Sequence, residues 1–124
     1  KEIPKHLLPK VRQVFKEYKV KVLKSYSDNL TVSIDGIQLT FVTYPFPLLF
    51  KLVNFEGVNL LSVREIGLTK AYTVGRRASL KDYVDLYFII KERYLTIEEI
   101  IRLSKKKYRE EFNARLFLEQ LVYL

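Results

Sequence analysis

The sequence lacks cysteine, methionine and tryptophan, and its one histidine is His6. Without cysteine the chain can form neither a disulfide nor a thiolate metal site, which fits a reducing compartment and predicts a cytoplasmic protein. A single histidine near the start supports neither a catalytic triad nor a metal centre. Because residue 1 is lysine rather than methionine, we expect the numbered chain to be a fragment of a longer product or to follow a cleaved tag.

Glycine-rich stretches and long apolar runs are also missing. The four glycines are scattered, so no glycine-rich phosphate loop is present. No apolar run approaches the roughly 20 residues that span a bilayer, and charged residues interrupt any signal-peptide pattern at the start. A chain of 124 residues that is 48% hydrophobic can bury a core, so we expect one domain over 1–124 and no membrane partner.

Positive charge is concentrated at the start of the chain. The net charge is +8, and residues 1–24 contain eight Lys or Arg against two Glu. Such an excess can attract a phosphate backbone, which suggests RNA, for example tRNA, as a partner. The other interpretation is that these charges only solubilise an exposed helix, and the sequence leaves both open.

The first half of the chain changes from helical to alternating periodicity. Apolar residues in 7–18 recur at helical spacing and predict an N-terminal helix. Residues 19–43 alternate apolar and polar side chains, which predicts a three-stranded antiparallel meander. The Asp35-Gly36 pair between two alternating runs indicates a type I′ hairpin turn. Pro45 and Pro47 should end the sheet, because proline has no N–H to donate.

The second half reads as helical, with helices predicted at 63–74, 80–93, 97–108 and near 113–123. Three of the predicted starts carry a hydroxyl followed three residues later by a carboxylate, the pattern of a capping box. These pairs are Ser62 with Glu65, Ser79 with Asp82, and Thr96 with Glu99. The predicted fold class is therefore α+β, with a helix and sheet over 1–47 and a helical subregion over 48–124.

Candidate site residues gather around the segment that follows Ser79. Asp82 and Asp85 are three apart and share one helix face, with Lys81 and Arg77 beside them and Lys70 upstream. Capping explains Asp82 equally well, the helix dipole explains Asp85, and Lys70 could be an ordinary surface lysine. The residues predicted for the core on this helix are Tyr83, Leu86, Tyr87 and Ile90.

Several motifs in order resemble the AbiEii/AbiGii-type nucleotidyltransferases, which include toxin components of type IV toxin–antitoxin systems. The matching stretches are Tyr44-Pro45-Phe46-Pro47, the acidic-led segment from Glu65 to Lys70, the run from Lys81 to Tyr87, and the closing NARLFLEQLVYL. The resemblance covers nearly the whole chain. It implies a partial nucleotidyltransferase fold, in which Lys70 approaches nucleotide phosphates, Asp82 or Asp85 completes the catalytic site, and Arg77 and Lys81 are secondary phosphate contacts.

The resemblance also implies what an intact member would use: an NTP, Mg²⁺, transfer of NMP to RNA or protein, and an antitoxin as a possible partner. Family members carry a Gly-Gly or Gly-Ser turn and an Asp-x-Asp pair that holds the metal ions, and this sequence has neither. Thr40 stands where a third acidic residue is often found. We therefore expect no metal site and no activity from this chain alone. The alternative is a non-catalytic basic module that binds RNA or a protein.

Overall fold

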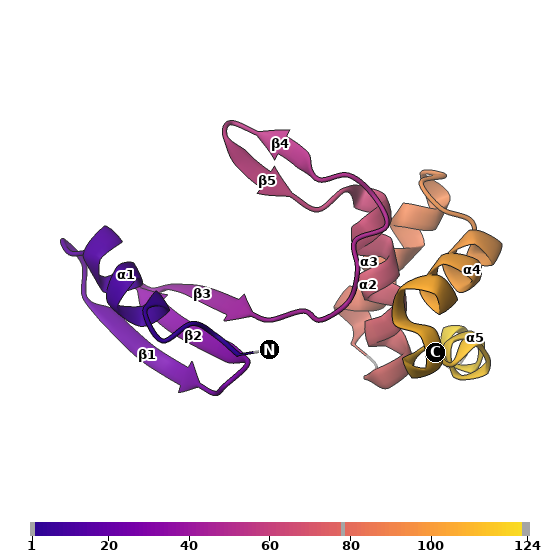
Figure 1. Cartoon of the computed structure of the whole chain (residues 1–124). Coiled ribbons are helices and arrows are strands. Elements are labelled where there is room, and N and C mark those ends of the chain that lie inside the picture. The colour runs from indigo at the N-terminus through magenta and orange to yellow at the C-terminus, as the bar shows by residue number, and fades with distance from the viewer. Residues whose placement is uncertain (1, 78, 123–124) are drawn as a thin grey trace. The chain divides into compact units, whose positions relative to one another are not determined.

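The computed structural model describes residues 2–77 and 79–122, which pack into two compact units over 1–45 and 46–124. The first unit combines one helix with a sheet, and the second is mainly helical (Figure 1). This arrangement confirms the α+β fold class. That residues 1–124 form a single domain stays a prediction, although the boundary between the units falls close to the expected one at residue 47.

The first unit consists of helix α1, Leu7–Val14, and the three strands β1, Val20–Ser25, β2, Asn29–Ile34, and β3, Ile37–Val42. The strands form an antiparallel meander in the order β1-β2-β3, as the alternating pattern predicted. Asp35 and Gly36 both have positive φ, 50° and 80°, so the predicted turn chemistry is confirmed.

The core of the first unit lies between α1 and the sheet. Val11, Leu30, Val32 and Ile34 are buried together, with other apolar side chains around them. The predicted helix over 7–18 was too long, because it ends at Val14 and the chain then turns toward β1. Two apolar residues of the predicted range, Val14 and Tyr18, are 67% and 53% exposed.

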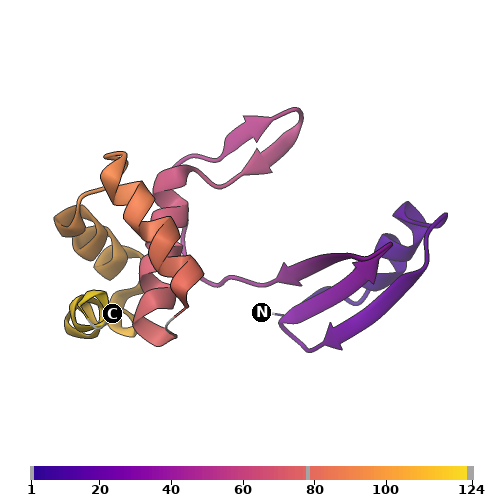
Figure 2. The ribbon, with the colours of Figure 1, turned by 180° about the vertical axis from the view of Figure 1, so that it is seen from behind.

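The second unit begins with a hairpin that the sequence interpretation missed. Strands β4, Val53–Phe55, and β5, Val58–Leu60, pair antiparallel across Glu56 and Gly57, which have φ of 49° and 84°. The helical subregion predicted over 48–124 therefore also contains two short strands, which the sequence interpretation did not include. All six strand residues are exposed, and the hairpin projects from the helices in both views (Figures 1 and 2).

Among the described residues, the second unit continues with four α-helices: α2, Val63–Arg76, α3, Leu80–Lys91, α4, Ile97–Tyr108, and α5, Ala114–Leu121. A 3₁₀ turn, Arg109–Glu111, links the last two. Each start agrees with the prediction within one residue, while the expected end at residue 123 lies outside the described residues. The helices pack around α2 (Figure 2) and enclose a core that includes Leu68, Ala71, Leu86, Ile100 and Phe117. Within the described part of the chain, no helix has the length and apolar content needed to cross a membrane.

The three predicted capping boxes had different outcomes. Thr96 and Glu99 form the full reciprocal box at the start of α4. Ser62 accepts a hydrogen bond from the Glu65 N–H, but the Glu65 carboxylate turns away from the helix start. Ser79 makes no side-chain cap, so that prediction was wrong. The Asp82 carboxylate is instead used by a lysine on another helix.

Candidate functional site

Helices α2 and α3 bring three of the predicted site residues into contact. Lys70 lies on α2, and its Nζ is 3.0 Å from Oδ1 of Asp82 and 2.8 Å from Oδ2 of Asp85 on α3. Asp82 and Asp85 share a face because they are three residues apart, so one ammonium group reaches both carboxylates. We call Lys70, Asp82 and Asp85 the lysine cluster.

The three side chains of the lysine cluster differ in how far solvent reaches them. The Asp82 side chain is 5% exposed, Lys70 is 22% exposed and Asp85 is 46% exposed. The hydrogen bond to Asp85 and the charge of both aspartates raise the pKa of Lys70 above its ordinary value, against the opposing effect of burial. Lys70 is therefore positively charged at neutral pH and is partly open to solvent.

The two remaining candidates lie at the margin of the lysine cluster. Arg77 is 76% exposed, and its Nε is 4.0 Å from Oδ2 of Asp82. Lys81 is exposed and joins no ion pair within residues 2–77 and 79–122. Arg76 makes a different contact: its guanidinium lies 4.5 Å from the centre of the Tyr72 ring. The structure thus joins Lys70, Asp82 and Asp85 directly, with Arg77 in weak contact.

The described residues offer few free ligands for a bound Mg²⁺. Among them, no group of three or more Asp, Glu or His side chains converges on one point. Asp82 and Asp85 are already engaged by an ammonium group, which competes with a cation for the same oxygens. Thr40, on β3, shares a hydrogen bond with the Thr31 hydroxyl at 3.1 Å and has no charge to offer a metal.

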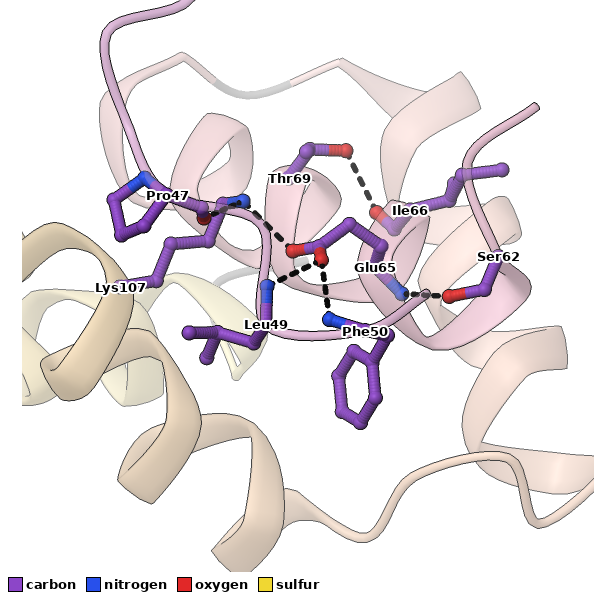
Figure 3. A network of polar contacts seen from close by, with 8 residues as sticks. All are labelled: Pro47, Leu49, Phe50, Ser62, Glu65, Ile66, Thr69 and Lys107. Carbon is purple, nitrogen blue, oxygen red and sulfur yellow. Dashed lines mark hydrogen bonds and ion pairs between the residues drawn. The ribbon is translucent and has the colours of Figure 1, made fainter. Parts of the chain in front are cut away.

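A buried ion pair between α2 and α4 was not predicted from the sequence. The Nζ of Lys107 on α4 is 2.7 Å from Oε2 of Glu65, and the two side chains are 0% and 1% exposed (Figure 3). Oε1 of Glu65 accepts hydrogen bonds from the Leu49 and Phe50 N–H groups at 2.7 and 3.0 Å. Lys107 also donates to the Pro47 carbonyl at 2.8 Å. The pair therefore ties the segment 47–50 to both helices.

The sequence held a signal for this buried pair. Lys107 follows Ile100 by seven residues and Leu103 by four, so it lies on the buried face of α4. A lysine in that position needs a buried carboxylate, because an unpaired charge in a core is costly. The identity of the partner was not readable, since Glu65 is 42 residues away.

Comparison with known proteins identifies a relative but no family profile. No protein-family profile and no solved structure matches the sequence. The uncharacterized protein aq_aa25 of Aquifex aeolicus (strain VF5) is 32% identical over 114 residues, which are 90% of this chain and 55% of that protein. The chain thus spans a little over half the length of this relative, whose name assigns no activity.

Proposed function

We propose that the lysine cluster is the phosphate-contacting part of a nucleotidyltransferase-type protein, whose intact form transfers NMP from an NTP to RNA or protein. The observation that supports this proposal is the state of Lys70: a charged ammonium group, fixed by two carboxylates and 22% exposed. The motif resemblance points to the same residues.

In this proposal each residue of the lysine cluster has a separate task. Lys70 attracts the triphosphate, because its ammonium is positioned before the ligand arrives and loses little freedom on binding. Asp82 is nearly buried and keeps Lys70 oriented. Asp85 is 46% exposed and can release Lys70 as a phosphate oxygen replaces it, leaving a carboxylate beside the reacting group. Arg77 and Lys81 add positive charge at the margin.

Nucleotide binding tests the proposal directly. We expect the chain to bind NTPs and inorganic triphosphate, and Lys70→Gln to weaken binding at least about tenfold, because a charge-assisted contact is lost. Lys105→Gln removes an equally positive, exposed side chain on α4 and should leave the affinity unchanged. Titration calorimetry measures both, and melting curves check that each variant is folded. Absence of triphosphate binding, or equal loss in both variants, would overturn the proposal.

A second candidate function is RNA binding by the first unit. Seven Lys and Arg side chains on and around α1 and β1 are exposed, and within the described residues none of them joins an ion pair. They are Lys5, Lys10, Arg12, Lys16, Lys19, Lys21 and Lys24. Uncompensated exposed cations of this kind bind a phosphate backbone with release of counterions.

Salt dependence separates RNA binding from mere solubility. We expect tRNA affinity, measured by fluorescence anisotropy, to fall steeply with salt. In the double variant Lys10→Glu/Lys16→Glu, the slope of the logarithm of the binding constant against the logarithm of salt concentration should shrink by about one per lost phosphate contact. The control Lys105→Glu/Lys106→Glu changes net charge equally on α4 and should preserve the slope. If tRNA does not bind at low salt, or both pairs act alike, the charges serve solubility only.

A further inference from the structure

Helix α3 carries apolar side chains on two faces, of which only one is covered within the described residues. Tyr83, Leu86 and Ile89 are buried in the helical core. On the opposite face Leu80, Val84, Tyr87 and Phe88 are 71%, 43%, 58% and 49% exposed. These four, here called the outer α3 stripe, are spaced i, i+4, i+7 and i+8, the spacing of a helix face that packs against another element. The prediction that Tyr87 belongs to the core of this chain was therefore wrong.

A groove runs beside the outer α3 stripe. A hollow of about 490 Å³ is lined by Tyr83, Leu86, Tyr87, Ile90, Lys91, Ile97 and Leu121. A second hollow of about 380 Å³ shares Ile90 and Ile97 with the first and continues along the start of α4. The groove lies among three helices, and a groove of this kind accepts the apolar face of an incoming helix.

The charge at the groove selects the kind of partner. Lys91 is the one charged residue among the seven that line the larger hollow, and its Nζ lies 6.0 and 5.7 Å from the Tyr87 and Phe88 rings. Lys81 is exposed on the same face of α3. The smaller hollow adds Arg93 and Glu98, one charge of each sign. Within the described residues neither lysine joins an ion pair, so each is open to a carboxylate from outside.

Two other occupants fit less well. A second copy of this chain carries the same net charge of +8, so electrostatic repulsion opposes self-association. RNA needs cations along a phosphate path, whereas the larger hollow is lined by six aromatic or aliphatic residues and one lysine. A helix that presents apolar residues on one side and carboxylates beside them satisfies both the groove and Lys91.

We infer that the outer α3 stripe and its groove bind an acidic amphipathic helix of a partner protein. The apolar residues of that helix cover Tyr87 and Phe88 and fill the larger hollow, while a carboxylate pairs with Lys91. Lys81, ten residues earlier on α3, can take a second carboxylate about 15 Å away. This binding does not require the lysine cluster, because the outer α3 stripe lies on a different face of α3 from Asp82 and Asp85. Lys81 is the one residue that this inference shares with the proposed phosphate contacts.

A designed peptide makes the inference testable. The probe is a synthetic helix of about five turns, with leucines at i, i+4, i+7 and i+11 and glutamates on the flanking positions. One comparison peptide has the same composition in scrambled order, and another has lysine in place of each glutamate. We expect micromolar binding of the acidic helix, weakened by salt, and at least about tenfold weaker binding of the other two.

Matched variants locate the binding surface. Phe88→Ser should weaken binding of the acidic helix at least about tenfold, whereas Phe55→Ser, at a 61% exposed aromatic on β4, should not. Lys91→Glu should reverse the preference between the acidic and the basic helix. Because Phe88 and Lys91 are exposed, these variants should fold, and circular dichroism checks it.

Three results would overturn the inference. One is equal binding of the acidic, scrambled and basic peptides. Another is binding that Phe88→Ser leaves unchanged. The third is a dimer of the chain in sedimentation that Phe88→Ser dissociates, which would assign the face to a second copy.

Discussion

Two charged clusters on the same helix behave differently because of their surroundings. Glu65 and Lys70 are five positions apart on α2, which places them about 140° apart around the helix axis. Glu65 meets Lys107 on α4 with both side chains essentially inaccessible. Lys70 meets Asp82 and Asp85 on α3 with one carboxylate nearly buried and the other half exposed.

This difference distinguishes charges that serve only the fold from charges that solvent can reach. The Glu65–Lys107 pair makes hydrogen bonds to Leu49, Phe50 and Pro47, so its polar atoms are occupied by the protein itself. Such a pair adds little net stability compared with an apolar core, but losing one partner leaves a buried charge. The lysine cluster is instead open to solvent on one side, where Asp85 is 46% exposed and Lys70 is 22% exposed.

The largest expected effect is the loss of Lys107. Lys107→Met should lower the free energy of unfolding by about 3–5 kcal/mol, because Glu65 is left as an uncompensated buried charge. Urea denaturation measures the change, and Lys105→Met on the exposed face of α4 is the control. The double variant Glu65→Gln/Lys107→Met should lose less than the sum of the single variants. A cost below about 1 kcal/mol would show that the pair is not sealed from water.

Removal of the Asp82 carboxylate, the more buried of the two in the lysine cluster, should have the next largest effect on stability. Asp82→Asn should cost about 1–3 kcal/mol, because Lys70 loses its more buried partner and the new amide cannot replace the charge. Thermal and urea unfolding give the value. The cost should be the same in a Ser79→Ala background, since Ser79 provides no side-chain cap. Strong coupling between the two changes would show that Ser79 and Asp82 interact, against the pairing of Asp82 with Lys70.

Alkaline pH should weaken the lysine cluster. The pKa of Lys70 is raised in the folded state above its ordinary 10.5, so its stabilising contribution is complete below that pH and is lost as pH rises through the folded pKa. The difference in unfolding free energy between wild type and Lys70→Met should therefore shrink at high pH. The effect should be smaller than that of Asp82→Asn, because solvent screens the exposed part of the cluster.

Tyr72 provides the control for this measurement. Burial raises the pKa of Tyr72, and its ionisation destabilises the fold in the same direction as pH rises. The comparison is therefore repeated in a Tyr72→Phe background, where the Lys70 contribution should persist. A gap between wild type and Lys70→Met that stays constant across the alkaline range would contradict the assigned ion pairs.

The smallest effect is expected at Asp85. Asp85→Asn should cost less than about 1 kcal/mol, because the pair with Lys70 is 46% exposed on the Asp85 side. The cost should fall further at high salt, whereas that of Lys107→Met should not, since buried pairs are screened much less. Urea denaturation at two salt concentrations tests both. An Asp85 effect as large as that of Asp82 would remove the distinction between an inner and an outer carboxylate.

Turns and helix caps could be predicted from the sequence wherever residues close together in the chain determine them. The Asp35-Gly36 turn follows from the need for positive φ at two adjacent residues, and Thr96 caps α4 with Glu99 three positions away. The same reasoning should have identified the Glu56-Gly57 hairpin, whose two central residues also have positive φ. It was missed because three-residue strands are too short to show a clear alternation.

The sequence by itself determined the order of helices and strands, apart from the β4–β5 hairpin, and the face shared by Asp82 and Asp85, because both follow from backbone periodicity. Only the tertiary structure decided which side chains form ion pairs with the charged residues. Asp82 carries the spacing of a cap but binds Lys70, because the packing of α2 against α3 places the Lys70 ammonium 3.0 Å from its carboxylate. Lys107 pairs with Glu65 only because α2 and α4 pack together. Such contacts depend on how helices distant in sequence meet, which no local spacing encodes.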